Sequence, residues 1–398
     1  MTFRTLRDVD VRGKRVVVRE DLNVPLKDGA VGDDTRLVAA LPTLRFLREH
    51  GARTIVLSHL GRPDGKPSPK FSLAPVAREL DARLGNVSFC PDCVGPQAQA
   101  ASAALSDGDI VLMENVRFHP EEETNDAGFA RALASLGELY VNDAFGTAHR
   151  AHASTEGIAH DLPAVAGFLM EAELAALGKL TRDPALPFVC AIGGAKVKDK
   201  VGVFVNLLER VSSFVIGGGM ANTFLAAQGV NVGTSLRDSD LVPARDILTR
   251  AAARGVPLHL PVDAVVSVSF DADDRAETVN VGDVGQRMIL DIGPRSAQAY
   301  ATTLRAARTI VFNGPMGVYE KPAYQNGTRV VGEAIAAATK AGATSVVGGG
   351  DAAAAAHELG FAAAMTHVST GGGATLEFLE GKTLPGVAAL EAAAAKVS

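Results

Sequence analysis

The sequence lacks tryptophan and contains only three cysteines and 5% aromatic residues among its 398 positions. An odd number of cysteines does not form the disulfide framework that small secreted proteins use. Gly, Pro or a charged residue interrupts every apolar run before it reaches about 18 residues, so we expect no membrane-spanning helix and no membrane partner. Residues Met1–Asp10 lack the apolar core of a signal peptide, and we therefore expect a cytoplasmic protein.

The length and the charge balance limit the class of protein further. Single hydrophobic cores stop growing at about 250–300 residues, so a chain of 398 residues is expected to form two domains. The composition, 47% apolar and 21% charged, is that of a globular protein. The net charge of −6 argues against a broad nucleic-acid-binding surface, although it leaves room for a local basic pocket.

Cys90 and Cys93 form a single CxxC pair, a pattern that elsewhere marks a redox centre or a zinc site. A zinc site of the usual kind needs a second ligand pair, which the sequence does not offer. The segment Phe89–Cys93 also has the pattern of the end of a strand. We therefore interpret both residues as free thiols.

Short β-branched runs alternate with longer amphipathic stretches along the chain, which is the pattern of repeated βαβ units around a parallel sheet. Most of the runs are continuously apolar, as expected for strands buried on both faces. The predicted strands are Arg15–Arg19, Thr54–Leu57, Ile110–Met113, Leu139–Val141, Phe188–Ile192, Ser213–Ile216, Leu258–Leu260, Thr309–Phe312, Ser345–Val347 and His367–Ser369. The predicted fold class is α/β, with two doubly wound, Rossmann-like domains built on parallel sheets.

Residues 166–182 have the composition of a helix with no strand pattern around it, and Arg182-Asp183-Pro184 ends it. We predict that this is a hinge helix joining an N-terminal domain of residues 1–165 to a C-terminal domain of residues 183–375. Residues 376–398 form a terminal segment. The alternative is an ordinary surface helix within one domain. The acidic stretch Asp271–Glu277 is expected to be an exposed hairpin or loop without chemistry.

Ligands of open parallel sheets bind beyond the carboxyl ends of the strands, so the residues after each predicted strand carry the function. In the first half these residues are rich in cations: Arg62, Arg117, Arg150, His59, His149 and His152, joined by Arg36 at the start of a helix. Guanidinium groups bind carboxylate and phosphate oxygens two at a time, so the set suits a small, doubly anionic substrate. Asp21 and Asn23 are expected to bind hydroxyl groups. Any one of these residues alone is more simply explained as a surface or core residue.

In the second half the predicted strands end in glycine-rich turns, at Gly193-Gly194, Gly217–Gly219, Gly348–Gly350 and Gly371–Gly373. Glycine lets the backbone approach a phosphate, and a helix N-terminus adds a positive dipole end. Lys196 and Lys200 offer mobile positive charge to a phosphate chain, and Asp351 is a hard oxygen ligand for the Mg²⁺ of a nucleotide. Glu320 is either a ribose ligand or a solvated loop acid.

Two nucleotide-binding fingerprints are incomplete in this chain. Gly217–Asn222 lacks the last glycine of GxGxxG, and Gly381-Lys382-Thr383 has only the end of a P-loop, with Leu376 at the position of its first glycine. An NAD-linked dehydrogenase would need the missing glycine. A non-catalytic two-lobed binding protein would explain the arginines, but not the lysines and Asp351 among glycine-rich turns.

The sequence resembles phosphoglycerate kinases over essentially its whole length. The matching blocks are Arg19–Pro25, Ser58–Pro63, Glu114–Phe118, Val141–Ser154, Gly193–Lys200, Gly217–Ala221, Phe312–Glu320, Gly348–Asp351 and Ser369–Ala374. The resemblance implies reversible phosphoryl transfer between 1,3-bisphosphoglycerate and MgADP, giving 3-phosphoglycerate and MgATP. It also implies a monomer whose residues 376–398 pack back near the hinge and the N-terminal domain. Three positions depart from the pattern: Phe312 where Trp is frequent, Ala352 in place of Ser or Thr, and Glu20 in place of an apolar residue.

The resemblance also implies the role of each matching residue. Phosphoglycerate would be held by Asp21, Asn23, Arg36, His59, Leu60, Gly61, Arg62, Arg117, His149 and Arg150. The nucleotide would be held by Gly194, Lys196, Lys200, Gly218, Gly293, Asn313, Pro315, Glu320, Gly349, Gly350, Asp351 and Ala352, with Asp351 as metal ligand. Arg36 and Lys196 would be catalytic, helped by helix N-termini at Gly350 and Gly372.

Phosphoryl transfer needs positioning and charge stabilisation more than covalent chemistry, so we expect direct in-line transfer without an enzyme intermediate. The attacking carboxylate is already ionised and needs no general base, which leaves the histidines to bind and orient. Because the two sets of residues lie in different halves of the chain, we also expect a hinge closure that brings them together.

Overall fold

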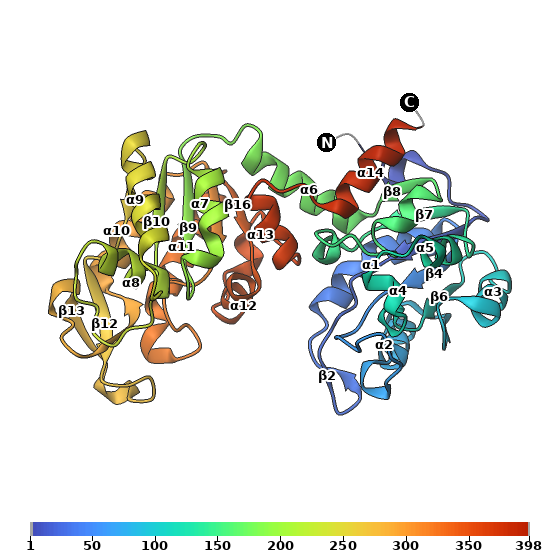
Figure 1. Cartoon of the computed structure of the whole chain (residues 1–398), viewed down its shortest axis with the longest axis horizontal. Coiled ribbons are helices and arrows are strands. Elements are labelled where there is room, and N and C mark those ends of the chain that lie inside the picture. Colours follow the sequence, from blue (N-terminus) through green and yellow to red (C-terminus); the bar gives the residue numbers. More distant parts are fainter. Residues whose placement is uncertain (1–2, 397–398) are drawn as a thin grey trace. The chain divides into compact units, whose positions relative to one another are not determined.

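The computed structural model describes residues 3–396, apart from the side chain of Asp274. The chain divides into two compact units (Figure 1). Unit 1 contains the residues up to Leu174 and those from Thr383 onward, and unit 2 contains Ala175–Lys382. The first boundary falls inside helix α6 (Phe168–Thr181), and helix α13 (Gly373–Leu379) lies within unit 2.

Unit 1 is built on a six-stranded parallel sheet in the order β5-β6-β4-β1-β7-β8. The strands are β1 (Arg15–Arg19), β4 (Arg53–Leu57), β5 (Val87–Cys90), β6 (Ile110–Met113), β7 (Leu139–Asn142) and β8 (Ala164–Ala166). The central ones are short Val-, Ile- and Leu-rich runs whose side chains are nearly all buried, as a sheet covered on both faces requires. The expectation that no strand adjoins the helix predicted at residues 166–182 was wrong, because β8 ends two residues before α6. Three residues are too few to give a recognisable strand pattern in the sequence.

Helices cover this sheet and the chain end returns to it. They are α1 (Thr35–Glu49), α2 (Ala74–Leu84), α3 (Gly95–Ala103), α4 (Pro120–Glu123), α5 (Ala127–Ala134) and α14 (Pro385–Ala395), with a small hairpin of β2 (Leu26–Lys27) and β3 (Ala30–Val31). Helix α5 begins where the Asp126 side chain accepts a hydrogen bond from Phe129 N. Helix α14 contacts β8, and Gly386 N donates to Ala148 O at 2.9 Å, so the last helix is part of unit 1.

Unit 2 is built on a second six-stranded parallel sheet in the order β11-β10-β9-β15-β16-β17. Its strands are β9 (Phe188–Ile192), β10 (Ser213–Ile216), β11 (Leu258–His259), β15 (Thr309–Asn313), β16 (Thr344–Val347) and β17 (His367–Val368). Counted along the chain this is the order 3-2-1-4-5-6 of dinucleotide-binding folds, in which the ligand crevice opens where the order reverses. Here the reversal lies between β9 and β15.

The helices of unit 2 are α7 (Val201–Leu207), α8 (Gly218–Ala227), α9 (Val242–Arg254), α10 (Pro294–Arg305), α11 (Asn326–Lys340), α12 (Gly350–Glu358) and α13. A separate antiparallel sheet of β13 (Glu277–Asn280), β12 (Asp263–Ser267) and β14 (Met288–Ile292) is inserted before α10. The acidic stretch that the sequence assigned to an exposed hairpin connects β12 to β13 in this sheet.

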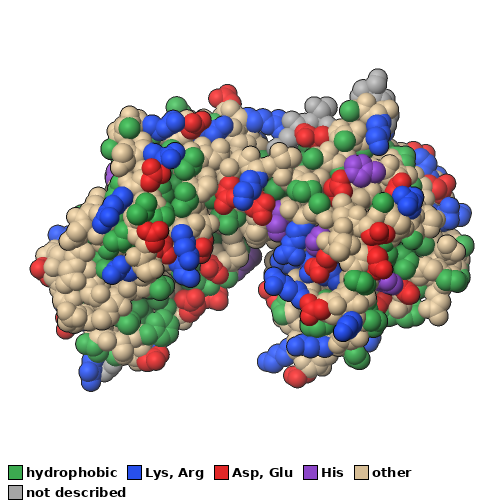
Figure 2. Space-filling model, viewed as in Figure 1, with side chains coloured by type: hydrophobic (Ala, Val, Ile, Leu, Met, Phe, Trp, Pro, Cys, Tyr) green, Lys and Arg blue, Asp and Glu red, His purple; other side chains and the backbone are tan. Residues whose placement is uncertain are grey.

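The predicted α/β fold with parallel sheets is confirmed. On the face seen in Figure 2, basic and acidic side chains are interspersed over both units, while the strands beneath are buried. Among residues 3–396, no helix has both the length and the apolar character needed to span a bilayer.

Candidate active site

The first group of predicted site residues lies at the carboxyl ends of β1 and β4 in unit 1. Arg36, in the first turn of α1, donates through Nη1 to Asp21 Oδ1 at 3.1 Å and to the carbonyl oxygen of Asn23 at 3.2 Å. Asn23 Oδ1 accepts from Gly61 N at 2.9 Å. A Cβ at Gly61, where φ is +61°, would lie 2.4 Å from the Phe71 ring, so this turn requires glycine. These contacts tie the two strand ends and the helix start into one cluster.

Arg117 joins the cluster from the turn after β6. Its Nη1 donates to Gly61 O at 2.9 Å, and its Nε lies 3.3 Å from Glu123 Oε1. Its Nη2 is buried and has no hydrogen-bond partner in the described part of the chain. Burial lowers the pKa of this guanidinium to about 10, which still leaves it charged at neutral pH. A buried cationic donor without a partner is stabilised by an anionic ligand.

His59 is buried at the centre of this group, with Nδ1 3.1 Å from Arg19 Nη2. Burial, followed by the positive charges of Arg19, Arg117, Arg36 and Arg150, holds the pKa of His59 well below its usual range. Burial, followed by the positive charges of Arg117, Arg19 and Arg150, lowers the pKa of His152 to about 4. Both imidazoles are therefore neutral at physiological pH, and the arginines converge on one place.

The remaining predicted residues of unit 1 lie around this centre. Leu60 is buried, and its carbonyl oxygen accepts from Asn115 Nδ2 at 2.7 Å. Arg150 Nε lies 3.3 Å from His149 Nε2, and both side chains are half-buried. Arg62 is exposed, and among the described residues no hydrogen bond or ion pair joins it to the others.

The second group surrounds a cavity of about 350 Å³ in unit 2, where the strand order reverses. Its lining residues are Gly194, Ala195, Lys196, Asp199, Lys200, Asn313, Gly314, Gly348, Gly349, Gly350, Asp351, Ala352, Gly372, Gly373 and Leu376. Helices α12 and α13 begin in this lining, so their free N–H groups and dipole ends lie at the cavity. The predicted glycine-rich turns after β9, β16 and β17 thus meet at one site.

Lys200 is not the mobile charge that the sequence suggested. Its Nζ donates to the carbonyl oxygens of Gly193 at 2.8 Å and Asn313 at 2.7 Å. Burial lowers the pKa of this ammonium to about 8, with Asp351 acting in the opposite direction. Lys196, in contrast, is exposed at the cavity.

Polar groups of this cavity suit the phosphates and the metal of a nucleotide. Asn313 Oδ1 is buried with no hydrogen-bond partner among the described residues, while Nδ2 donates to Gly348 O at 2.6 Å. Asp351 is an exposed carboxylate in the first turn of α12. Mg²⁺ in nucleotide sites is held by one or two carboxylates, phosphate oxygens and water, and this donor set fits that requirement. Ala352 is buried and brings only a methyl group.

A second cavity of about 440 Å³ shares Gly194 and Ala195 with the first. Its other lining residues are Gly218, Gly219, Ala221, Asn222, Thr234, Leu236, Pro261, Phe270, Met288, Ile289, Leu290, Asp291, Ile292, Pro315, Met316, Gly317, Val318 and Glu320. Mostly apolar walls beside a phosphate-type cavity suit a nucleotide base.

Gly218 has φ +65°, and a Cβ there would lie 2.8 Å from Gly194 O. Gly293 lines neither cavity and instead packs closely against Asp263.

Comparison with known proteins identifies the family. A family model described as Phosphoglycerate kinase matches residues 6–382. The chain belongs to the phosphoglycerate kinase family. The phosphoglycerate kinase of Moorella thermoacetica is 56% identical over 393 residues, covering 98% of this chain and 99% of the relative. That of Chloroflexus aurantiacus is 54% identical over 398 residues, covering 98% and 99%.

Solved structures of the family agree with this assignment. The phosphoglycerate kinase of Coxiella burnetii superimposes with a TM-score of 0.91 at 42% identity, covering 99% of this chain and 100% of that one. The enzyme of Pyrococcus horikoshii gives a TM-score of 0.86 at 34% identity, with the same coverage. The chain is therefore a phosphotransferase with a carboxyl group as acceptor, and it interconverts 1,3-bisphosphoglycerate and ADP with 3-phosphoglycerate and ATP in glycolysis.

Sequence reasoning missed several residues that line these cavities or shape their loops. Leu236, Phe270 and Leu290 in the apolar cavity come from loops and the antiparallel sheet, where no parallel-strand pattern points to a ligand. Asp238 was also missed, although its Oδ2 accepts from Val197 N at 2.8 Å and so shapes the loop that carries Lys196. A single aspartate in a loop gives no sequence signal for such a contact.

Proposed function

We propose that this phosphotransferase works by direct, in-line transfer between a phosphoglycerate held by unit 1 and a nucleotide held by unit 2. The observation that carries the proposal is the division of chemistry between the units. Unit 1 gathers arginines around a neutral histidine, which suits two small anionic groups. Unit 2 surrounds its cavity with glycine backbone, helix N-termini and lysines, which suits a phosphate chain.

In unit 1, the phosphoglycerate is bound by Asp21, Asn23, Arg36, His59, Leu60, Gly61, Arg62, Arg117, His149 and Arg150. The unsatisfied Nη2 of Arg117 supports this assignment, because an anion would satisfy it. In unit 2, the nucleotide is bound by Gly194, Lys196, Lys200, Gly218, Gly293, Asn313, Pro315, Glu320, Gly349, Gly350, Asp351 and Ala352. Of these, Gly293 has the least support, since it lines neither cavity.

The transferred phosphoryl group carries charge on its equatorial oxygens, and we assign Arg36 and Lys196 to neutralise it. Backbone N–H groups at Gly350 and Gly372 add donors from helix N-termini. The acceptor carboxylate is ionised at neutral pH and needs no base. The lowered pKa values of His59 and His152 support this reading, because neutral buried imidazoles bind and orient rather than accept a proton at pH 7.

Mg²⁺ enters as part of the nucleotide and would be held by its phosphates and by Asp351. When bound, the ion neutralises phosphate charge during transfer. Lys200 meanwhile joins the backbone at Gly193 to that at Asn313, so its tethered ammonium links the ends of β9 and β15 beside the cavity that we assign to the phosphates.

Because the two binding sets belong to different units, the proposal includes a hinge closure that brings them together and excludes water from the acyl phosphate. We further propose that the protein acts as a cytoplasmic monomer. Small-angle scattering should give a smaller radius of gyration with 3-phosphoglycerate and a nucleotide analogue together than with either alone. An unchanged radius in the ternary complex would rule out closure, and a doubled mass would rule out the monomer.

A coupled assay tests the catalytic proposal as a whole. Purified protein supplied with 1,3-bisphosphoglycerate, ADP and Mg²⁺ should form ATP in proportion to enzyme concentration. A dehydrogenase would instead require a nicotinamide cofactor, and a non-catalytic two-lobed binding protein would bind the acid without turnover. Either result would overturn the assignment.

A further inference from the structure

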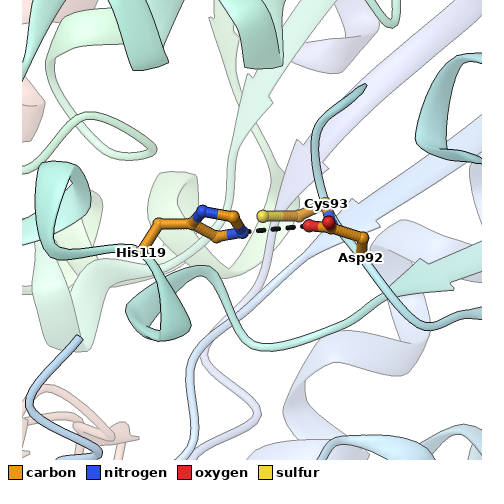
Figure 3. Close-up of side chains that lie close together, drawn as sticks. All are labelled: Asp92, Cys93 and His119. Atoms are coloured by element: carbon orange, nitrogen blue, oxygen red, sulfur yellow. Dashed lines mark hydrogen bonds and ion pairs between the residues drawn. The ribbon is translucent and has the colours of Figure 1, made fainter. Parts of the chain in front are cut away.

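Unit 1 contains a second cluster of polar side chains, which shares no residue with the arginine group. Asp92 and Cys93 follow the end of β5 at Cys90 by two and three positions, and His119 is the residue just before α4. One ligand atom of each side chain lies within 4.8 Å of the others. Figure 3 shows the three side chains pointing toward one another from two separate segments. The sequence analysis interpreted Cys93 as a free thiol. His119 lies 26 positions later and is not part of a second ligand pair, so no zinc pattern joined it to Cys93.

We propose that Asp92, Cys93 and His119 form a binding site for one borderline-soft divalent cation of the zinc type. A thiolate, an imidazole and a carboxylate are the three side-chain ligands that zinc uses. A thiolate in the set disfavours Mg²⁺ and Ca²⁺, which select oxygen ligands. The site is therefore chemically distinct from the nucleotide's Mg²⁺ at Asp351.

The distances are compatible with such an ion. Tetrahedral zinc with bonds of about 2.0–2.3 Å places its ligand atoms about 3.4–3.6 Å apart. His119 Nε2 now lies 2.9 Å from Asp92 Oδ1, the separation of a shared hydrogen, so an ion replacing that hydrogen opens the pair by about 0.5 Å. The separations from the Cys93 sulfur are at most 4.8 Å, so each needs to contract by no more than about 1.3 Å, which a side-chain rotation can supply.

The surroundings hold these ligands and admit an ion. Asp92 Oδ1 also accepts from Cys93 N at 2.7 Å, which fixes the carboxylate beside the thiol. The His119 ring packs against Phe129 with centroids 5.1 Å apart. Asp92 and His119 line an open cavity of about 610 Å³, whereas Cys93 is only 1% exposed behind them. Ions and the water that completes the coordination can enter through this cavity.

The surroundings of the Cys93 thiol argue against a nucleophilic role. Burial and the negative charges of Asp92 and Glu122 raise the pKa of Cys93 well above its usual range. A catalytic cysteine needs a lowered pKa and access to substrate, and this residue has neither. Acidic groups around a ligand set attract a divalent cation instead.

A bound ion would link the loop after β5 to the turn that contains Arg117, which we assign to substrate binding. His119 follows Arg117 by two positions, and Arg117 Nη1 donates to Gly61 O. The bound ion is thus expected to stabilise the Arg117 turn without touching the substrate.

Cobalt(II) titration of the full-length, metal-stripped protein tests the site. Wild type should develop a thiolate-to-cobalt charge-transfer band that saturates at one equivalent, and Zn²⁺ should displace it and raise Tm. Cys93→Ser and His119→Gln should lose the band, whereas Cys90→Ala and the matched control Cys190→Ala, a buried thiol of unit 2, should keep it. Comparable circular dichroism and ATP formation by Cys93→Ser would show that the variant is folded.

Three results for the cobalt band would overturn the proposal. They are the absence of the band in wild type at saturating Co²⁺, an equal band in Cys93→Ser, and loss of the band in Cys90→Ala instead. An equal rise of Tm with Zn²⁺ in wild type and Cys93→Ser would also overturn it, because the ion would then bind elsewhere.

Discussion

Arg36 Nη1 lies 3.1 Å from Asp21 Oδ1, and the same nitrogen donates to the carbonyl oxygen of Asn23. Among the described residues, neither Nε nor Nη2 of Arg36 has a hydrogen-bond partner. One edge of the guanidinium is thus held by the carboxyl end of β1, and the other is left for a ligand. Asp21 therefore positions Arg36 through an ion pair made with one edge of the guanidinium only.

Replacing Arg36 by Ala should remove charge stabilisation from the transition state. We expect kcat to fall about 10²–10³-fold, or roughly 3–4 kcal/mol, while the Kd for ADP stays unchanged. Steady-state kinetics and nucleotide titration separate the two effects. Arg45→Ala, an exposed arginine on the same helix, is the matched control and should retain wild-type kcat. A kcat for Arg36→Ala within a few-fold of wild type would remove Arg36 from the mechanism.

The contact between Arg36 and Asp21 should also appear as non-additivity. Asp21→Asn alone lowers kcat by releasing the arginine, so the double variant should be little worse than Arg36→Ala. We expect a coupling energy of about 0.5–3 kcal/mol in the double-mutant cycle. Fully additive effects would mean that Asp21 acts on the substrate alone.

Lys200 gives the free enzyme a pH-dependent nucleotide site. Its pKa is lowered to about 8, so the ammonium loses its proton as pH rises through that value. The Kd for ADP should therefore increase above pH 8, by at most about tenfold per pH unit for one proton. Isothermal titration from pH 7 to 9.5 measures this dependence. Lys200→Met should bind weakly and show no such slope, while Lys198→Met, an exposed neighbour, should behave as wild type.

Glu20 and Asp143 form a buried acid pair at the end of β1 and β7, and they govern stability rather than binding. Burial and the negative charge of Asp143 raise the pKa of Glu20 well above its usual range. Burial raises the pKa of Asp143 to about 6, although its Oδ1 accepts from Met170 N at 3.0 Å in the first turn of α6. The folded state therefore keeps a proton on this pair that the unfolded chain has lost.

A raised folded-state pKa means that stability falls as pH increases from about 4.3 through the folded value. Glu20→Gln keeps the shape and the donor without the charge. It should match wild type near pH 4 and exceed it by on the order of 1–3 kcal/mol at pH 8. Denaturant unfolding at both pH values measures this, with the exposed Glu49→Gln as control. A constant difference between variant and wild type across pH would contradict the buried-proton account.

Lys321 is predicted to set nucleotide affinity through Phe270. Its Nζ donates to Phe270 O at 2.7 Å and lies 4.3 Å from the centre of that ring, which lines the apolar cavity. Lys321→Ala should raise the KM for ATP several-fold and leave kcat unchanged, because only ground-state binding is lost. Phe270→Ala should do the same, and the double variant should add nothing. Lys340→Ala, at the exposed end of α11, is the control and should leave both the KM for ATP and kcat unchanged. A lowered kcat would show that the loop acts in the chemical step.

The sequence predicts those parts of the fold whose signal is local. Buried parallel strands such as Ile110–Met113 and Phe188–Ile192 were located to the residue, because both faces are apolar. The glycine-rich turns after β9, β16 and β17 predicted the phosphate-type cavity, because glycine at a strand end is also a local signal. Strand β8, only three residues long, offered no comparable pattern.

Contacts between distant segments could not be predicted in this way. The apolar cavity takes Leu236, Phe270 and Leu290 from three segments, and the Asp92, Cys93 and His119 cluster joins two. The tethering of Lys200 depends on a carbonyl oxygen 113 positions away, at Asn313. Each depends on tertiary packing, which single-residue patterns do not encode.

Direct transfer between two substrates is the central claim, and the configuration at phosphorus tests it most directly. ATP made chiral at the γ-phosphorus with sulfur and oxygen isotopes would be used to thiophosphorylate 3-phosphoglycerate. A single in-line displacement predicts complete inversion at phosphorus in the product. Retention would require a covalent enzyme intermediate and would contradict the account.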